Sequence, residues 1–215
     1  TDINVTTTGA VYGDANGIYT YNYGTGDTTI VATNATGDAS VSGRLHGIQV
    51  FGDTTSTNIS ITANDVYGRY EEAVYARHNG SGDLSITVTN ADGTGSAISN
   101  NDVGILAYNY NGGALSGTAD NVSGNVPTGG DGIETYQDAA GTTTDITTYG
   151  DDAVYYGIFS RHYGTGDVTV MSTNATGTAT VYGYNTGVRG NNEGAGSVES
   201  TLDNATGQYD DGVFV

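Results

Sequence analysis

The chain has 215 residues, of which 35 are Gly, one is Pro and none is Cys or Trp. It carries five basic residues, all Arg, against 24 acidic ones, so the formal net charge is −19. This composition excludes disulfides and thiolate metal sites, and so acidic a surface disfavours nucleic acid and anionic membranes as partners. No apolar run approaches the ~18 residues of a membrane-spanning helix, so we expect no direct membrane insertion.

An internal repeat organises the sequence. Residues 17–46 and 157–186 align without a gap, and both contain YGTGD followed by TNATG. Each repeat opens with a small residue followed by Ile or Val, and the openings are 25–31 residues apart. They fall at Gly17, Gly47, Ala73, Gly104, Gly132, Gly157, Gly187 and Gly212. A fixed phase with variable length predicts one solenoid over residues 1–215, with about seven coils.

Each repeat begins with a run that alternates like a strand with one buried face. In Ile18-Tyr19-Thr20-Tyr21, the first and third residues are expected to point inward and the other two outward. The inward column that opens the runs contains only β-branched residues, which suit a stacked, pleated surface. Its members are Ile18, Ile48, Val74, Ile105, Ile133, Ile158, Val188 and Val213.

Two further runs complete each coil. The second follows a Gly-Asp turn, and its expected inward residues are Ile30, Ile61, Ile86, Ile146 and Val170. The third is shorter and is expected at 39–41, 153–155 and 179–181. Helical periodicity is absent, so the fold class is all-β. We predict a right-handed parallel β-helix (β-solenoid) with three short strands per coil, its handedness transferred from crossover connections by analogy.

An Asn recurs between the second and third runs. It occupies Asn34, Asn64, Asn90, Asn121, Asn174 and Asn204. Asn tolerates the left-handed backbone of a sharp turn, and stacked amides can donate to one neighbour and accept from the other. We therefore predict a structural Asn ladder along one corner.

The repeated block, 17–37 and its echo 157–177, resembles the β-helical passenger domains of bacterial autotransporters and related large surface adhesins. The resemblance covers the whole chain and is specific for architecture. It implies an extracellular or cell-surface location, but such passengers include adhesins, proteases, cytotoxins and inert stalks.

The two ends carry no visible cap. Residues 1–5 begin in the phase of the second run, and 212–215 stop on the first. Two interpretations follow, a segment of a longer solenoid or a subunit that stacks head to tail into a filament, and we favour the first.

Candidate catalytic and metal-binding residues are sparse. Arg77-His78 and Arg161-His162 share one repeat position, three coils or ~14 Å apart, and we interpret them as solvent-facing residues near a corner. Asp27, Asp83 and Asp167 recur after Gly and could attract Ca²⁺, but no calcium-binding nonapeptide repeat is present, so turn chemistry is favoured. We expect no enzyme, catalytic residue, metal site or cofactor, with a carbohydrate-active enzyme as the weakest alternative.

The best functional lead is the outward side of the first run. Its aromatic and Arg residues form two predicted columns, which suit either sugar stacking and protein contact or stabilisation of the sheet itself. The candidate binding residues are Tyr19, Tyr21, Phe51, Tyr75, Arg77, Tyr108, Tyr136, Phe159 and Arg161. The expected function is an extracellular structural or adhesive stalk. Its expected partner is itself, end to end or laterally, or a glycan or protein of a host or cell surface.

Overall fold

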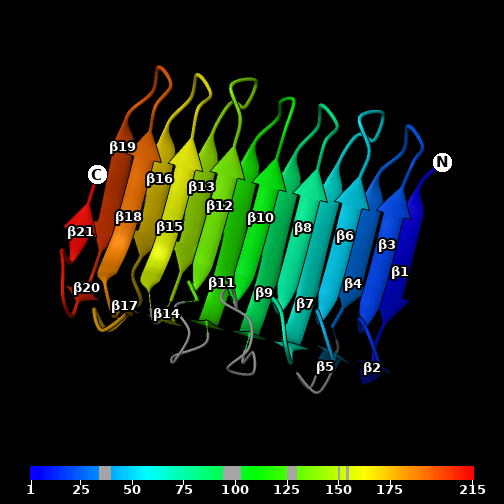
Figure 1. Cartoon of the computed structure of the whole chain (residues 1–215), viewed down its shortest axis with the longest axis horizontal. Helices are drawn as coiled ribbons and strands as arrows, with labels where there is room; N and C mark the ends of the chain where they lie inside the picture. The colour runs from blue at the N-terminus through cyan, green and yellow to red at the C-terminus, as the bar shows by residue number, and fades with distance from the viewer. Residues whose placement is uncertain (34–39, 94–102, 125–129, 150, 154) are drawn as a thin grey trace.

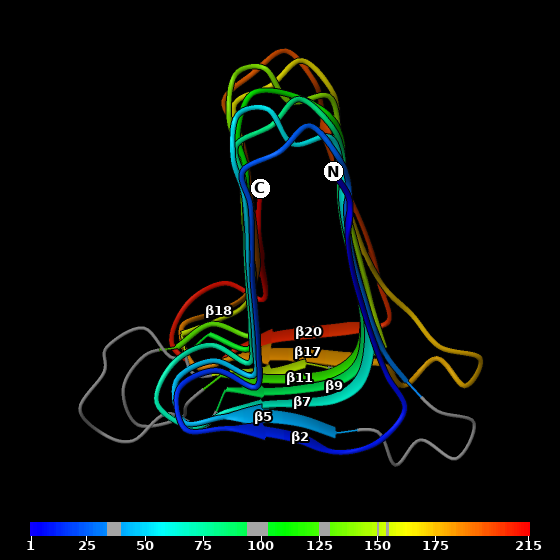
Figure 2. The same cartoon turned by 90° about the vertical axis from the view of Figure 1, so that its right-hand side faces the viewer.

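The computed structural model describes residues 1–33, 40–93, 103–124, 130–149, 151–153 and 155–215. They form a parallel β-solenoid of about six turns with two main sheets and a small third. Figure 1 shows the strands of successive turns side by side along the long axis, from β1 at one end to β21 at the other. In the end-on view of Figure 2, two long walls enclose a narrow interior and the third sheet closes the base.

Sheet 1 is one of the two walls, and all of its strand pairs are parallel. Its strands lie side by side in chain order, so each coil adds one strand beside the last. Its strands are β3 (Ile18–Asn22), β6 (Ile48–Gly52), β8 (Val74–His78), β10 (Ile105–Asn109), β12 (Ile133–Gln137), β15 (Tyr156–His162), β18 (Thr186–Asn192) and β21 (Val213–Phe214).

Sheet 2 is the opposite wall. Its strands are β1 (Ile3–Thr7), β4 (Thr28–Ala32), β7 (Ile59–Gly68), β9 (Leu84–Gly93), β11 (Leu115–Gly124), β13 (Thr144–Thr148), β16 (Val168–Ser172) and β19 (Val198–Leu202). The three ten-residue strands β7, β9 and β11 continue into sheet 3, which also contains five further strands. Those are β2 (Val11–Gly13), β5 (Ser40–Gly43), β14 (Asp151–Ala153), β17 (Thr180–Gly183) and β20 (Asn204–Gly207).

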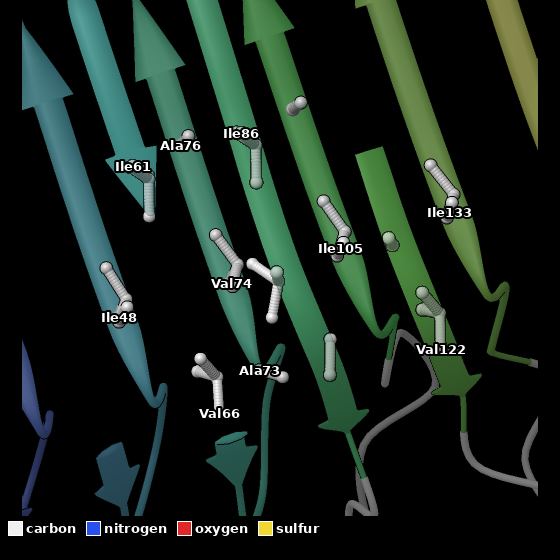
Figure 3. Packing of buried hydrophobic residues seen from close by; sticks show 14 of the residues in the cluster. Ile48, Ile61, Val66, Ala73, Val74, Ala76, Ile86, Ile105, Val122 and Ile133 are labelled. Carbon is white, nitrogen blue, oxygen red and sulfur yellow. The ribbon is translucent and has the colours of Figure 1, made fainter. Parts of the chain in front are cut away.

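The inward column predicted for the first run is confirmed by the register of sheet 1. Ile18 pairs with Ile48, Ile48 with Val74, and the column continues rung by rung to Val213. The column predicted for the second run also holds, with Ile30, Ile61 and Ile86 in register and buried. Figure 3 shows Ile48, Val74, Ile105 and Ile133 repeating along the interior. Burying each such side chain stabilises the fold by about 1.5–3 kcal/mol.

The third run departs from the prediction in one coil. We expected it at 153–155, but β14 spans Asp151–Ala153 and pairs Asp151 with Val181. Here only residues 149–150 separate β14 from β13, whereas residues 173–179 separate β17 from β16. The prediction matched residues 153–155 to residues 179–181, so it placed residue 155 beside Val181. Because this corner is shorter, the residue beside Val181 is Asp151, four residues earlier. Of the run expected at 39–41, residue 39 lies outside the described residues.

Among the residues that the structure describes, no helix is long and apolar enough to cross a lipid bilayer. The right hand of the coil stays a prediction.

Candidate functional site: an aromatic surface on sheet 1

The two predicted outward columns lie side by side on the outer face of sheet 1. Tyr21 pairs with Phe51, Phe51 with Arg77 and Arg77 with Tyr108, and the same column continues to Tyr136 and Arg161. The neighbouring column starts at Tyr19 and passes through Tyr75 and Phe159. Parallel in-register pairing therefore brings all nine candidate binding residues onto one face.

The rings contact each other along most of this face. Tyr19 and Tyr21 both lie against Phe51, with centroid distances of 6.1 and 5.6 Å. Phe51 meets Tyr75 edge to face at 5.4 Å, and Tyr75 meets Tyr108 at 6.1 Å. Pairs in these geometries contribute about 0.5–1.5 kcal/mol each beyond their area burial.

Three tyrosines extend this surface beyond the predicted columns. Tyr23 stacks on Tyr21 at 3.9 Å, Tyr110 stacks on Tyr108 at 5.9 Å, and Tyr163 lies 5.4 Å from Tyr136. Each is two residues beyond an outward residue of the strand, so period-two alternation continued past the strand end would have identified it. We call the residues Tyr19, Tyr21, Tyr23, Phe51, Tyr75, Tyr108, Tyr110, Tyr136 and Tyr163 the aromatic surface.

The aromatic surface is accessible but partly packed. The Tyr19 side chain is 55% exposed and Tyr23 is 72% exposed, while Phe51, Tyr75, Tyr108 and Tyr136 are half-buried. Arg77 lies 5.3 Å from the Tyr110 ring, and Arg161 lies 5.2 Å from the Phe159 ring. The guanidinium groups therefore pack on neighbouring rings of the same face.

A cluster of buried carboxyl groups adjoins the aromatic surface. Glu72 and Asp131 are nearly inaccessible, and Glu72 Oε2 lies 3.0 Å from His46 Nδ1. Burial and the nearby Glu134 carboxyl raise the pKa of Asp131 to about 7, although its Oδ1 accepts a hydrogen bond from the Tyr156 amide. Burial also raises the pKa of Tyr108, as does the charge of Glu134. Both groups are therefore held toward their neutral forms.

The interpretation of both Arg-His pairs as solvent-facing is wrong for the two histidines. His78 and His162 are fully buried and point inward, while Arg77 and Arg161 point outward. The alternation that places Val74 and Ala76 inside places His78 inside as well. The signal in the sequence was the run of polar residues at this position in the other coils.

These histidines belong to a buried polar column at the end of the sheet 1 strands. His78 Nδ1 lies 3.0 Å from Asn109 Oδ1, and His162 Nδ1 lies 3.0 Å from Gln137 Oε1. Because a carbonyl oxygen only accepts, each ring donates from Nδ1. Burial lowers the pKa of both histidines, which keeps them neutral. We call Asn22, Gly52, His78, Asn109, Gln137, His162 and Asn192 the interior polar column.

The repeated Asp residues before sheet 2 act as caps on the next coil. Asp27 Oδ1 accepts a hydrogen bond from the Asn58 amide at 3.0 Å, and Asp83 Oδ1 accepts one from the Ala114 amide at 2.8 Å. Asp167 Oδ1 accepts from both the amide and the hydroxyl of Ser197. The Thr57 hydroxyl, which also donates to Asp27 Oδ1, and the Asn58 amide lower the pKa of Asp27, and the two bonds from Ser197 lower that of Asp167. Within the described ranges, no group of three or more acidic or His side chains could hold a metal ion.

The predicted Asn ladder does not run through one column. Register places Asn90 beside Asp65 and Asn121, and Asn204 beside Thr180. Asn174 lies in a turn, where its Oδ1 accepts hydrogen bonds from the Thr176 and Thr178 amides. Asn64 lies in β7, and Asn34 lies outside the described residues. The corner loops differ in length, so equal sequence position there does not mean equal height in the stack.

Comparisons with known proteins return no relative. No family model matches the chain, and neither a curated protein nor a solved structure matches it. The function must therefore be argued from the surface itself.

Proposed function

We propose that this chain is an adhesive stalk of a cell-surface protein and that its aromatic surface contacts neutral polysaccharide. The observation that carries the proposal is the chain of ring contacts from Tyr19 to Tyr163, which crosses five successive strands of sheet 1 and ends on the residue that follows β15. Sugar rings stack well on such surfaces because their C–H faces are apolar and their hydroxyls stay in water.

The position of the surface on the solenoid supports this proposal. Its rings rise from consecutive strands at intervals of ~4.8 Å, so they form a continuous track that a polymer can follow. A backbone fixed by parallel hydrogen bonds loses little freedom on binding, which favours contact. Contact through exposed aromatic rings also explains why they are not fully packed, since sheet stabilisation alone does not need Tyr23 at 72% exposure.

The electrostatics support a neutral partner for this surface. The formal charge of −19 repels anionic polymers at long range, and the Glu134 carboxyl in the same outward column as Tyr19 and Tyr75 adds to that repulsion. The resemblance of the coil to autotransporter passengers supports placing the stalk outside the cell.

The proposal is tested by retention on immobilised cellulose and mannan. The variant Tyr21→Ser/Phe51→Ser/Tyr136→Ser removes three rings, and we expect at least a tenfold weaker retention. The control Tyr184→Ser/Tyr209→Ser removes an exposed ring pair with a 4.5 Å contact outside the aromatic surface and should bind like the parent. Equal retention of parent and triple variant would refute the proposal. A second outcome would also refute it: the parent self-associates but does not bind polysaccharide, and the triple variant no longer self-associates. The aromatic surface would then pack against a second copy of the chain.

A further inference from the structure

Sheet 3 carries a pocket that the aromatic surface does not include. Its volume is about 350 Å³, and it is lined by Tyr12, Ser42, Gly43, Arg44, Tyr67 and Arg69. Small-molecule sites commonly start at about this size. The residues come from β2, β5 and β7 and from the turns after them. The pocket is therefore built by three successive coils on a face of its own, at the base of the cross-section in Figure 2.

The register gives the pocket the form of a slot between two rings. Tyr12 pairs with Ser42, and Ser42 pairs with Tyr67, so a small residue separates two tyrosines in one outward column. Two rung spacings place the two tyrosines ~9.6 Å apart at their backbones. A ring placed midway lies ~4.8 Å from each tyrosine position, so it reaches the usual contact distance of ~3.5–4 Å when the tyrosine side chains lean toward it by about 1 Å. Tyr12 is 72% exposed and Tyr67 is 38% exposed, so both rings are accessible.

Two guanidinium groups border this slot. Arg44 and Arg69 directly follow Gly43 and Gly68, which are in register. The ladder extends one residue further, because the Arg44 amide donates to the Gly13 carbonyl and the Arg69 amide to the Gly43 carbonyl. The chain thus holds two of its five cations on adjacent rungs. Such like charges repel, and an anion between them would relieve the repulsion.

The tyrosine on the same turn fixes both cations. The Arg44 and Arg69 guanidinium carbons lie 5.6 and 5.3 Å from the centre of the Tyr70 ring. In the part of the chain that the structure describes, neither guanidinium forms an ion pair with a carboxylate. The planar fork of each Arg matches a carboxylate or sulfate group.

We propose that this slot binds an acidic sugar, with the ring between Tyr12 and Tyr67 and the carboxylate or sulfate on Arg44 and Arg69. Asp92 pairs with Tyr67 on the next rung, and Asp14, Asp65 and Glu71 are near the lining in sequence, so these acidic residues set a limit on affinity. Charges more than ~8–10 Å away are screened at physiological salt, so the local cations dominate over the net charge of −19. This site does not depend on the aromatic surface, which is on sheet 1.

The test is an NMR titration of the whole chain with glucuronate, glucose and inorganic sulfate as separate probes. We expect glucuronate to bind with a Kd near ~1 mM, and glucose and sulfate each to bind at least tenfold more weakly. Arg44→Gln and Arg69→Gln should each weaken glucuronate about tenfold. The control Arg189→Gln removes the same charge from β18 in sheet 1 and should have no effect.

A second variant keeps the test independent of charge. Ser42→Tyr fills the slot with a third ring in an outward column that already accepts tyrosine above and below, and it should abolish binding while the far-UV spectrum stays that of the parent. The assignment would be overturned if glucose or sulfate bound as tightly as glucuronate. It would also be overturned if Ser42→Tyr or the two Arg variants bound glucuronate like the parent. The triple variant of the aromatic surface should bind glucuronate normally, which separates this proposal from the proposed function.

Discussion

At the scale of single residues, the interior polar column is the least expected feature of the molecule. His162 has no exposed surface, and among the described residues its Nε2 has no hydrogen-bond partner. Burying such a group without a partner costs free energy. The neutral ring is the tolerable form, since its Nδ1 can donate to Gln137 while a charged ring would be stranded in the core.

The histidines should make the fold sensitive to acid. Burial lowers the pKa of His162 in the folded state below the ordinary value of ~6.5. The unfolded chain therefore takes up the proton first as the pH falls below ~6.5, and the unfolding free energy drops by up to ~1.4 kcal/mol per pH unit for each histidine. We expect His162→Gln, which copies the residue of the preceding coil, to lose less stability than the parent between pH 7.5 and 5 in urea unfolding. An identical pH dependence in the two proteins would contradict this reading.

Asp131 should make the fold less stable as the pH rises, which is opposite to the effect of the histidines. Its pKa is raised to about 7, mainly by burial, so the folded state holds a proton that the unfolded chain releases near pH ~4. Stability from this group is present at low pH and is lost as the pH rises from ~4 to ~7. Asp131→Asn keeps an oxygen for the Tyr156 amide and removes the charge, so it should be more stable than the parent by roughly 1–4 kcal/mol at pH 8. Thermal or urea unfolding at pH 5 and 8 measures this, and a destabilised variant at pH 8 would rule it out.

At the scale of strands and coils, the inward column of the second run contains one position without a side chain, Gly117. Gly117 stands between Ile86 and Ile146 in the second-run column, and a Cβ added there meets no atom within 4 Å. Gly117→Ala should therefore raise the unfolding free energy by about 0.4–1 kcal/mol, chiefly by restricting the unfolded chain. Gly43→Ala is the matched contrast, because its Cβ would collide with the His46 carbonyl oxygen and should destabilise. Urea unfolding of both variants provides the comparison, and a loss of stability in Gly117→Ala would show that the space is not open.

The in-and-out alternation of sheet 1 is tested by moving one charge by one residue. Ile158 is fully buried between Ile133 and Val188, so Ile158→Asp should cost at least ~3–5 kcal/mol. Phe159→Asp places the same charge outward, where Arg161 and Arg189 now lie over the ring, and should cost far less. Thermal unfolding of the two variants gives the comparison. Similar losses in both would mean that the assignment of faces is wrong.

At the scale of the whole molecule, strands were predictable and corners were not. Ile18, Ile48 and Val74 repeat because every coil must bury the same face, so a sequence column maps directly onto a column in space. Asn174 lies in a corner loop that spans residues 173–179, whereas the corner at 149–150 is much shorter. Because the corners differ in length, neither the Asn ladder nor the third run near residue 151 could be aligned from sequence.

For the two proposed binding surfaces as well, residues within strands were predictable from the sequence and residues at strand ends and corners were not. The aromatic surface follows from alternation within strands, so its columns were predicted, although Tyr23, Tyr110 and Tyr163 beyond the strand ends were missed. The Arg44 and Arg69 pocket needs the register between β2, β5 and the second half of β7, which the sequence pattern does not give. The prediction for His78 was wrong because it treated Arg77 and His78 as a pair on one face, whereas neighbouring residues of a strand point to opposite faces.

In-register stacking of coils underlies both proposed surfaces, and distances along one outward column of sheet 2 measure it most directly. The chain has no Cys, so pairs of introduced Cys residues can carry spin labels without background. Thr29 is three rungs from Ser116 and six rungs from Glu199.

Pulsed electron spin resonance should therefore give ~14 Å for labels at 29 and 116, and ~29 Å for labels at 29 and 199. Narrow distributions whose centres differ by ~14 Å would agree with the stacked solenoid. Broad distributions, or a separation that does not grow with the number of rungs, would contradict it.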